Sequence, residues 1–381
     1  MRRIVKLFLL LLIPFFSNAQ TNRIDSLQQL LKKETKDTSR VLLLNQLGTA
    51  YMYSKPDTAL LLSQQALPLS KKAGFTKGEA ASLLLMGNVF INTGNYPKAL
   101  EALLQSLKKY EAIQDKEGIQ MVTSNLGSIY SLQGDYRQAI NYIFKSLALS
   151  KSLGIQRRTA VALINLGDSY EKLNMLDSAK YYAIQAYNLS SQLKNKDIIG
   201  ASLNNLGNIY SKMGNTAAAM RNYRSSNAYY MEERDDAGLC ETYLGMAKLF
   251  QKAGNADSSL YYAKLSLAIA QNDGFTNYVL DASKFLTGYY TSMYNVDSAF
   301  AYQSIAIAAK DSLFSQEKQH QLQSLRFDEA TRQQEIQDAK TEAQTQQKFN
   351  LLFGGLFALL VVAFILLRNN RQKRKANVLL Q

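Results

Sequence analysis

Asparagine recurs in this 381-residue chain at a spacing that suits a binding site. Asn125, Asn165 and Asn205 lie forty residues apart. A side-chain amide carries both hydrogen-bond donors and acceptors, so a row of amides can hold the backbone of an extended peptide without reading its sequence. Each amide could instead hydrogen-bond a neighbouring helix or turn, and both interpretations stay open. A second polar row, three residues further along this register, contains Asn88, Asp168, Asn208 and Lys248.

Residues for covalent or metal chemistry are scarce. The chain has one cysteine, Cys240, and one histidine, His320. A Ser-His-Asp triad, a Cys-His pair or a histidine-rich metal site would have to be built around His320. No phosphate-binding glycine loop is recognisable. The sequence therefore predicts a protein that is not an enzyme and holds no cofactor or metal. Chemistry based on carboxylates alone stays open, but no positive signal supports it.

The net charge of +14 is concentrated at the two ends of the chain. Arg2, Arg3 and Lys6 stand at the start, and five basic residues stand between positions 368 and 375. Neither cluster forms the basic stripe, interleaved with aromatic side chains, that is typical of nucleic-acid binding. The distribution therefore argues against a DNA or RNA partner.

The first nineteen residues predict a secretory signal peptide. Residues 1–19 read MRRIVKLFLLLLIPFFSNA, in which a basic start precedes an apolar run and small residues precede the cleavage site after Ala19. An uncleaved membrane anchor is the alternative. The apolar run is short for a membrane span, however, and Pro14 interrupts it.

A second apolar segment, residues 349–367, predicts one transmembrane helix. It carries no charged residue, and at about 1.5 Å rise per residue it matches the roughly 30 Å hydrocarbon core of a bilayer. The basic tail 368–381 comes directly after it. The positive-inside rule therefore places this tail in the cytoplasm and residues 20–348 in the periplasm, outside the inner membrane. Gly354 and Ala358 form a small-xxx-small pair, which is compatible with a homodimer through this span and the segment before it.

Four positions recur seven times along the chain at intervals of forty residues, although the glycine of the first copy, Gly48, is one residue out of step. In the third copy they are Gly127, Tyr130, Ala139 and Ser146. Leu126, which precedes the glycine, and Tyr130 lie four residues apart and share one face of a helix. Small residues are expected where two helices approach closely, and Gly, Asn and Asp stand between the predicted helices. The pattern predicts helical hairpins that bury their apolar faces by stacking on one another.

This pattern resembles the tetratricopeptide repeat, whose signature also has Leu-Gly-x-x-Tyr and a later alanine. The resemblance covers residues 41–310 and implies an all-α, right-handed solenoid of about seven forty-residue hairpins. Residues 20–40 would form a capping helix before the array, and residues 311–348 a helical stalk after it. The period is longer than the usual length of about 34 residues, and the usual proline is missing at Lys71 and its equivalents. In this family a concave groove lined by the first helices binds protein or peptide ligands.

The order of segments resembles the extracytoplasmic half of the tetratricopeptide-repeat sensor histidine kinases of Bacteroidetes. The stretches RIDSLQQLLKK, SKPDTALLLSQQAL and RQKRKANVLLQ carry this resemblance. It implies a single-pass inner-membrane protein whose periplasmic repeats bind a protein or peptide in a sensing or scaffolding role. The alternative is the sensor portion of such a kinase, or of a related transcriptional regulator, without its cytoplasmic output domain, because the chain ends 14 residues after Leu367.

Overall fold

The structure is a computed structural model that describes residues 13–313, 337, 340–341 and 343–355. The chain divides into two compact units, Met1–Lys318 and Gln319–Gln381. The described residues form α-helices joined by short turns, and none of them lies in a β-strand. The predicted all-helical fold is therefore confirmed.

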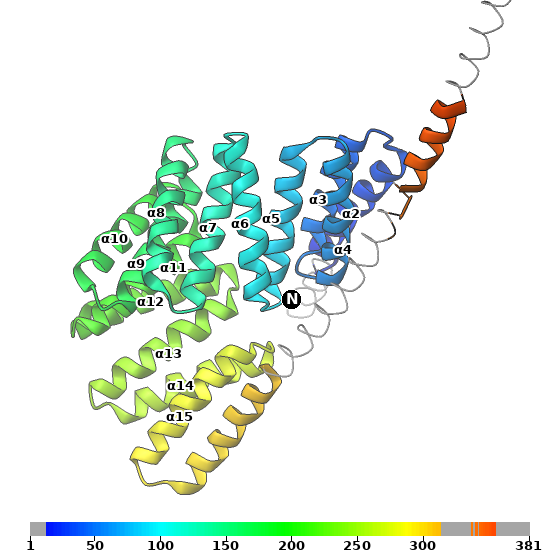
Figure 1. Cartoon of the computed structure of the whole chain (residues 1–381). Coiled ribbons are helices and arrows are strands. Elements are labelled where there is room, and N and C mark those ends of the chain that lie inside the picture. The colour runs from blue at the N-terminus through cyan, green and yellow to red at the C-terminus, as the bar shows by residue number, and fades with distance from the viewer. Residues whose placement is uncertain (1–12, 314–336, 338–339, 342, 356–381) are drawn as a thin grey trace, which may run out of the picture. The chain divides into compact units, whose positions relative to one another are not determined.

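The first unit is a row of helical hairpins that lie side by side (Figure 1). The helix α2 (Ile13–Lys33) precedes the row and packs on the first hairpin. The first helices of the hairpins are α3 (Asp37–Tyr51), α5 (Thr76–Asn92), α7 (Lys116–Leu132), α9 (Gln156–Lys172), α11 (Lys196–Lys212), α13 (Asp236–Lys252) and α15 (Thr276–Ser292). The second helices are α4 (Pro56–Lys72), α6 (Tyr96–Ala112), α8 (Tyr136–Ser152), α10 (Leu176–Gln192), α12 (Thr216–Glu233), α14 (Ala256–Asn272) and residues 296–313.

One residue with positive φ closes each helix from α4 onwards. These residues begin at Gly74 and recur every twentieth position up to Tyr294. The residue after each of them donates its backbone N–H to a carbonyl five positions earlier, as Asp135 does to Tyr130 at 2.9 Å. This is the Schellman type of helix end. Two such units of twenty residues make the forty-residue period, so residues forty apart occupy equivalent places in successive hairpins.

Asparagine and aspartate side chains begin many of the helices. Asp135 accepts the backbone N–H of Gln138 at 3.1 Å, and Asn215 accepts that of Ala218 at 3.0 Å. These bonds satisfy N–H groups that have no partner inside the first turn of a helix. The Gly-Asn and Gly-Asp pairs between the helices therefore have two separate functions, since the glycine ends one helix and the next residue begins the following one.

The recurring glycine of the repeat lies where the two helices of a hairpin approach each other. A Cβ atom on Gly127 would lie 2.6 Å from Ile143 Cγ1, and one on Gly207 would lie 2.5 Å from the Tyr223 ring. Both distances are shorter than van der Waals contact. The glycines are therefore required by packing within the hairpin, as the small residue of the repeat predicts.

Stacked aromatic rings form a second contact inside the hairpins. The rings of Tyr130 on α7 and Tyr142 on α8 lie 5.4 Å apart and within 6° of parallel. Three other hairpins have an equivalent pair. Such pairs contribute about 0.5–1.5 kcal/mol beyond the area that they bury. The many tyrosines of the sequence thus serve in part to join the two helices of a hairpin.

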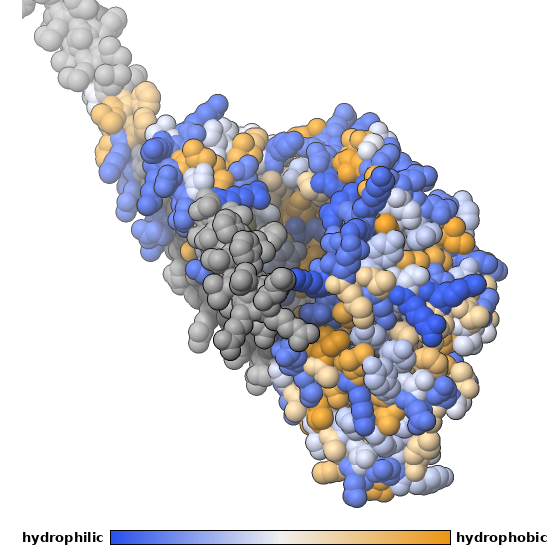
Figure 2. Space-filling view, turned by 180° about the vertical axis from the view of Figure 1, so that it is seen from behind, coloured by the Kyte–Doolittle hydropathy of each residue, from blue (hydrophilic) through white to orange (hydrophobic). Residues whose placement is uncertain are grey.

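First and second helices lie on different sides of the row. The backbones of consecutive first helices, such as α9 and α11, approach one another repeatedly within 8 Å between Cα atoms. Consecutive second helices among the described residues make no comparable approach. The first helices therefore form the inner side, and the second helices the outer side. On the face seen in Figure 2, hydrophobic residues form small groups among hydrophilic ones.

The predicted terminal segments are described only in part. The helix α2 begins at Ile13, inside the predicted signal peptide, and residues 1–12 lie outside the described residues. In the second unit, residues 343–355 are helical. They include the start of the predicted membrane segment 349–367, whose remainder is outside the described residues, as are His320 and the tail 368–381. No helix within the described ranges is long and apolar enough to cross a membrane.

We expect Gly167→Leu to destabilise the fourth hairpin by roughly 1–3 kcal/mol through overpacking. A Cβ atom at this position would lie 2.7 Å from Asn205 Oδ1, 3.4 Å from the Ala179 carbonyl and 3.4 Å from Ala183 Cβ. Gly167→Ala should cost less, because only the end of the Asn205 side chain has to move. Hydrogen exchange should show lost protection in α9 and its neighbours α10 and α11.

Gly288 provides the matched control for this prediction. It lies in α15, and no atom lies within 4 Å of the Cβ that a substitution would add. Gly288→Ala should stabilise the helix by up to about 1 kcal/mol, because glycine is a poor helix former. Equal protection in Gly167→Leu and Gly288→Leu would contradict the packing assigned to Gly167.

The turns allow an independent test. Lys194 is an exposed residue with φ of 52°, a conformation that costs an L-residue roughly 1–2 kcal/mol. Lys194→Gly removes this strain and so stabilises the folded state, although glycine also loses more conformational entropy on folding, which offsets part of the gain. We expect a net gain of about 0.5–1 kcal/mol in urea unfolding. The reciprocal change Gly214→Ala, at φ of 77°, should lower stability by a similar amount. A gain from both changes would be inconsistent with the turn geometry.

Candidate functional site

The inner groove is the surface that the first helices share. Two pockets in it are lined by described residues. The first has a volume of about 290 Å³ and is lined by α5, α7 and α9. We call it the Arg157 pocket. The second has a volume of about 560 Å³ and is lined by α9, α11, α13 and α15, with Tyr223 reaching in from α12. We call it the Glu171 pocket.

The Arg157 pocket contains a pair of amides. Asn125 Nδ2 donates a hydrogen bond to Asn88 Oδ1 at 2.5 Å, which joins α7 to α5 and fixes both side chains. Asn125 Oδ1 and Asn88 Nδ2 form no hydrogen bond within the described part of the chain. The pair therefore presents one acceptor and one amide donor group to the pocket, which are the groups that a peptide backbone needs.

Two arginines supply the charge of this pocket. Arg158 Nη1 donates to Gln120 Oε1 at 2.9 Å and lies 3.2 Å from Glu117 Oε1. Gln120 is buried and donates in turn to Ser146 Oγ at 2.9 Å, so Arg158 is held in place by α7 and α8. Arg157 is exposed and has no ion pair among the described residues. The pocket can therefore bind a carbonyl or carboxylate group through a guanidinium.

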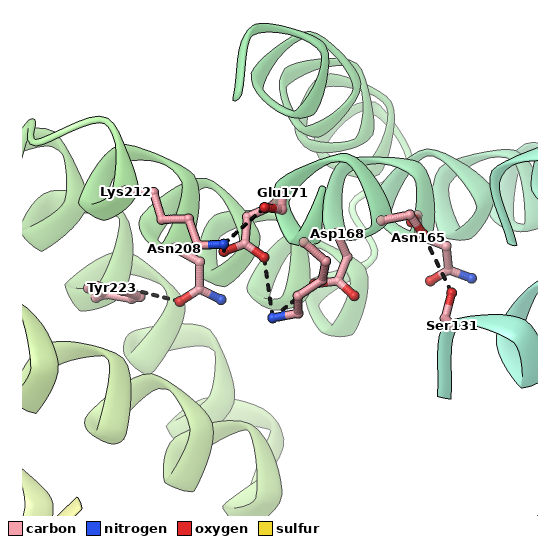
Figure 3. A network of polar contacts seen from close by, with 9 residues as sticks. Ser131, Asn165, Asp168, Glu171, Asn208, Lys212 and Tyr223 are labelled. Atoms are coloured by element: carbon pink, nitrogen blue, oxygen red, sulfur yellow. Dashed lines mark hydrogen bonds and ion pairs between the residues drawn. The ribbon is translucent and has the colours of Figure 1, made fainter. Parts of the chain in front are cut away.

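A buried carboxylate organises the Glu171 pocket. Glu171 is only 3 % exposed, and Lys212 Nζ lies 2.7 Å from its Oε1 and 2.9 Å from its backbone carbonyl oxygen (Figure 3). Lys172 Nζ lies 3.2 Å from Glu171 Oε2 and 4.0 Å from Asp168 Oδ1. A buried carboxylate without such partners would be strongly unfavourable. Glu171 therefore needs both lysines, and it fixes their positions on α9 and α11.

A hydrogen bond between α11 and α12, the two helices of one hairpin, also contributes to the Glu171 pocket. Tyr223 is 1 % exposed, and its hydroxyl donates to Asn208 Oδ1 at 2.7 Å. The bond orients the Asn208 amide so that its nitrogen remains for a ligand (Figure 3). Burial raises the pKa of Tyr223, so its hydroxyl keeps its proton at neutral pH and remains a donor.

The carboxyl groups along the groove are partly desolvated. Desolvation raises the pKa of Asp168. The positive charge of Lys172 acts to lower this pKa, and the negative charge of Glu171 acts to raise it further. Desolvation likewise raises the pKa of Glu241, where a hydrogen bond from Asn204 acts in the opposite direction. The pKa of Tyr278 rises to about 12, first through desolvation and then through the charge of Glu241. A positively charged group would therefore be favoured beside Glu241.

The structure places the predicted residues in different settings. Asn88 and Asn125 line the Arg157 pocket, and Asn208 and Lys248 line the Glu171 pocket. Asp168 is half-buried beside Lys172. The second polar row of the sequence therefore supplies a residue to each pocket.

The first row does not consist of three equivalent amides. Asn165 is half-buried and lines neither pocket. Asn205 is 6 % exposed, and its Oδ1 lies against Gly167. Asn205 therefore faces the packed interior. This agrees with the alternative in which such an amide contacts a neighbouring helix and not a ligand. Of the three, only Asn125 lines one of the two pockets described above.

The sequence analysis missed two rows of charged residues in the Glu171 pocket, although they recur at the same forty-residue spacing as the asparagines. Lys172, Lys212 and Lys252 lie forty residues apart, as do Glu241 and Asp281. Gln120 and Arg158 lack such a spacing. Their role became visible only through their hydrogen bonds.

Groups for metal or nucleophilic chemistry are not assembled in the described part of the chain. No group of three or more His, Cys, Asp or Glu residues could hold a metal ion there. Cys240 is fully buried, and desolvation raises the pKa of its thiol to about 12. Its sulfur donates to the Ser266 carbonyl at 3.6 Å. Cys240 therefore acts as a small core residue.

Two repeat families match the chain. The family described as tetratricopeptide repeat matches residues 78–152, 118–192 and 158–232. The SusR N-terminal TPR domain matches residues 13–111. Together they cover residues 13–232. The chain is therefore a tetratricopeptide-repeat protein. A search of curated proteins found no match.

Solved structures show the same fold at low sequence identity. The apo form of RapI is 15% identical with a TM-score of 0.63, over 72% of this chain and 99% of RapI. A Rap protein complexed with Competence and Sporulation Factor is 13% identical with a TM-score of 0.50, over 79% and 99%. The APC/C hetero-tetramer Cut9-Hcn1 is 12% identical with a TM-score of 0.54, over 79% and 52%.

We expect Glu171→Gln to lower stability by about 1–2 kcal/mol, because both lysines lose their common partner. This range allows for the exposure of the lysine side chains, which is 44% for Lys172 and 38% for Lys212. Urea unfolding measures the change. The control is Glu117→Gln, because the Glu117 side chain is 58% exposed and its ion pair with Arg158 should contribute little. Equal effects of the two changes would contradict the organising role of Glu171.

Proposed function

We propose that this tetratricopeptide-repeat protein binds a protein or peptide partner in its inner groove. The observation that carries the proposal is the pair of pockets, which line up along the first helices and present hydrogen-bonding groups with unused capacity. Amides and charged groups suit a polar backbone better than an apolar small molecule. The Rap complex and the Cut9-Hcn1 assembly support this proposal, since proteins of this fold bind other molecules.

We also propose that the repeats act outside the cytoplasm, in a sensing or scaffolding role. The support is the sequence alone. Residues 1–19 have the pattern of a signal peptide, and the apolar segment 349–367 precedes a basic tail. In this proposal a single inner-membrane span anchors the periplasmic array, and a homodimer through stalk and span could bring two arrays together.

The second candidate is the sensor portion of a histidine kinase or transcriptional regulator. The order of repeat array, stalk, apolar segment and basic tail favours it. Groove binding is common to both candidates, and they differ in whether an output domain continues the protein after residue 381. The nucleotide sequence downstream of codon 381 separates them, because an open frame for a kinase or DNA-binding domain would favour the second.

Site-specific photocrosslinking tests groove binding. A photoreactive residue replaces Ser124 in the Arg157 pocket or Ser211 in the Glu171 pocket of the full-length chain in its native cells. The control replaces Lys145, which is exposed on the outer helix α8. We expect both groove positions, and not the control, to crosslink to one partner. A partner captured only from Lys145 would refute the proposal.

The amide pair gives a second readout of the same experiment. Asn88→Ala combined with Asn125→Ala should weaken capture from Ser124, because each lost hydrogen bond contributes about 0.5–1.5 kcal/mol. Asn205 is unsuitable for this purpose, since its burial would mix a loss of stability with a loss of binding.

A further inference from the structure

The Glu171 pocket separates its charges along the helix α13. Glu241, Gly245, Lys248 and Lys252 all line the pocket and succeed one another at helical spacing. At about 1.5 Å rise per residue, Glu241 lies roughly 10 Å from Lys248 along the helix axis. Gly245 stands between them. The carboxylate and the lysines are therefore held at opposite edges of one surface.

The neighbouring helices extend both edges. On α15, Asp281 stands one period after Glu241, and on α11, Lys212 stands one period before Lys252. Glu241, Asp281, Lys248 and Lys252 form no ion pair within the described residues, so their charges are available to a ligand. The groove thus has an acidic edge on α13 and α15 and a basic edge on α11 and α13.

The Tyr223 side chain fills the centre of the floor between the two edges, at Gly245. A Cβ atom on Gly245 would lie 2.9 Å from the Tyr223 ring, so Tyr223 excludes any larger residue there. Leu244 and Phe285 form the apolar remainder of the floor. Tyr223, Leu244 and Phe285 therefore form a floor without a charged side chain, over which a ligand backbone can lie while its side chains reach the edges.

We propose that this groove binds an extended peptide segment in which basic and acidic side chains alternate. Side chains of an extended chain point alternately to opposite sides, so a segment lying across the first helices has every second side chain on the same edge. Basic side chains then face Glu241 and Asp281, and acidic ones face Lys248 and Lys252. The inference rests on the proposed binding of a protein or peptide, and it specifies the charge pattern of that partner.

Fluorescence anisotropy with labelled octapeptides tests this inference on the full-length chain in a nonionic detergent at low salt. The probes are an alternating Lys-Glu peptide, all-Glu, all-Lys and a neutral Gly-Ser peptide. We expect the alternating peptide to bind at least tenfold more tightly than the other three. An all-Glu or all-Lys peptide that binds equally well would overturn the inference, because one edge would then suffice.

Charge exchange supplies the decisive variants. Lys248→Glu/Lys252→Glu makes the unpaired groups of both edges acidic, and Glu241→Lys/Asp281→Lys makes them basic, so each pair of changes should weaken the alternating peptide about tenfold. The fourfold exchange, which combines the two pairs, swaps the unpaired charges of the edges, and the peptide can adapt by shifting one residue. Its affinity should return to within about threefold of the native value. Failure of the fourfold variant to recover, with the protein still folded by circular dichroism, would contradict the alternating pattern.

A matched control lies on the outer helix of the same hairpin. Asp257 and Lys264 on α14 are exposed and have the same seven-residue spacing. Asp257→Lys/Lys264→Glu should leave all four affinities unchanged, and an effect as large as that of the groove variants would overturn the inference. If peptides bind without a charge preference, only this inference fails. If no peptide binds, the proposed function fails with it.

Discussion

The regularity of the array depends on the left-handed residue that ends each helix from α4 to α15, at every twentieth position. It fixes helix length, because the chain must leave the helix where the Schellman bond forms, as between Asn215 N and Tyr210 O at 2.9 Å. Equal helices keep successive hairpins in the same register. Residues forty apart are then brought to the same face, and a polar side chain that recurs in sequence also recurs in space. The groove is a consequence of this register.

The same register explains why inner and outer helices differ in function. The first helices approach one another closely and share one surface, so their side chains act together. A second helix meets mainly the first helices on either side of it, and its outward face stays separate. Polar side chains of several hairpins can therefore converge only on the inner side. Glu171 illustrates this, since it joins α9 to α11 through Lys212 at 2.7 Å.

The fold could be predicted from the sequence because the same packing constraints recur in every repeat. Gly127, Tyr130 and Ala139 each have a local packing reason, and seven copies make the pattern unmistakable. The site was predictable only in part. A period shows which residues share a column, but not whether that column faces the groove or the neighbouring helix, and this depends on the size of residues elsewhere.

The asparagine column shows how that choice is made. Leu103 and Ile143 fill the space beside Gly87 and Gly127, and the amides of the next hairpin stay at the surface. Beside Gly167 the corresponding residue is Ala183, which is too small to fill the space, and Asn205 turns inward against Gly167. Tyr223 is so large that it fills the space beside both Gly207 and Gly245, and the column has no side chain there. The centre of the floor of the Glu171 pocket is therefore formed by a residue of the outer helix α12. A site in such an array is determined by pairs of residues from adjacent hairpins, and a search of one column at a time cannot find it.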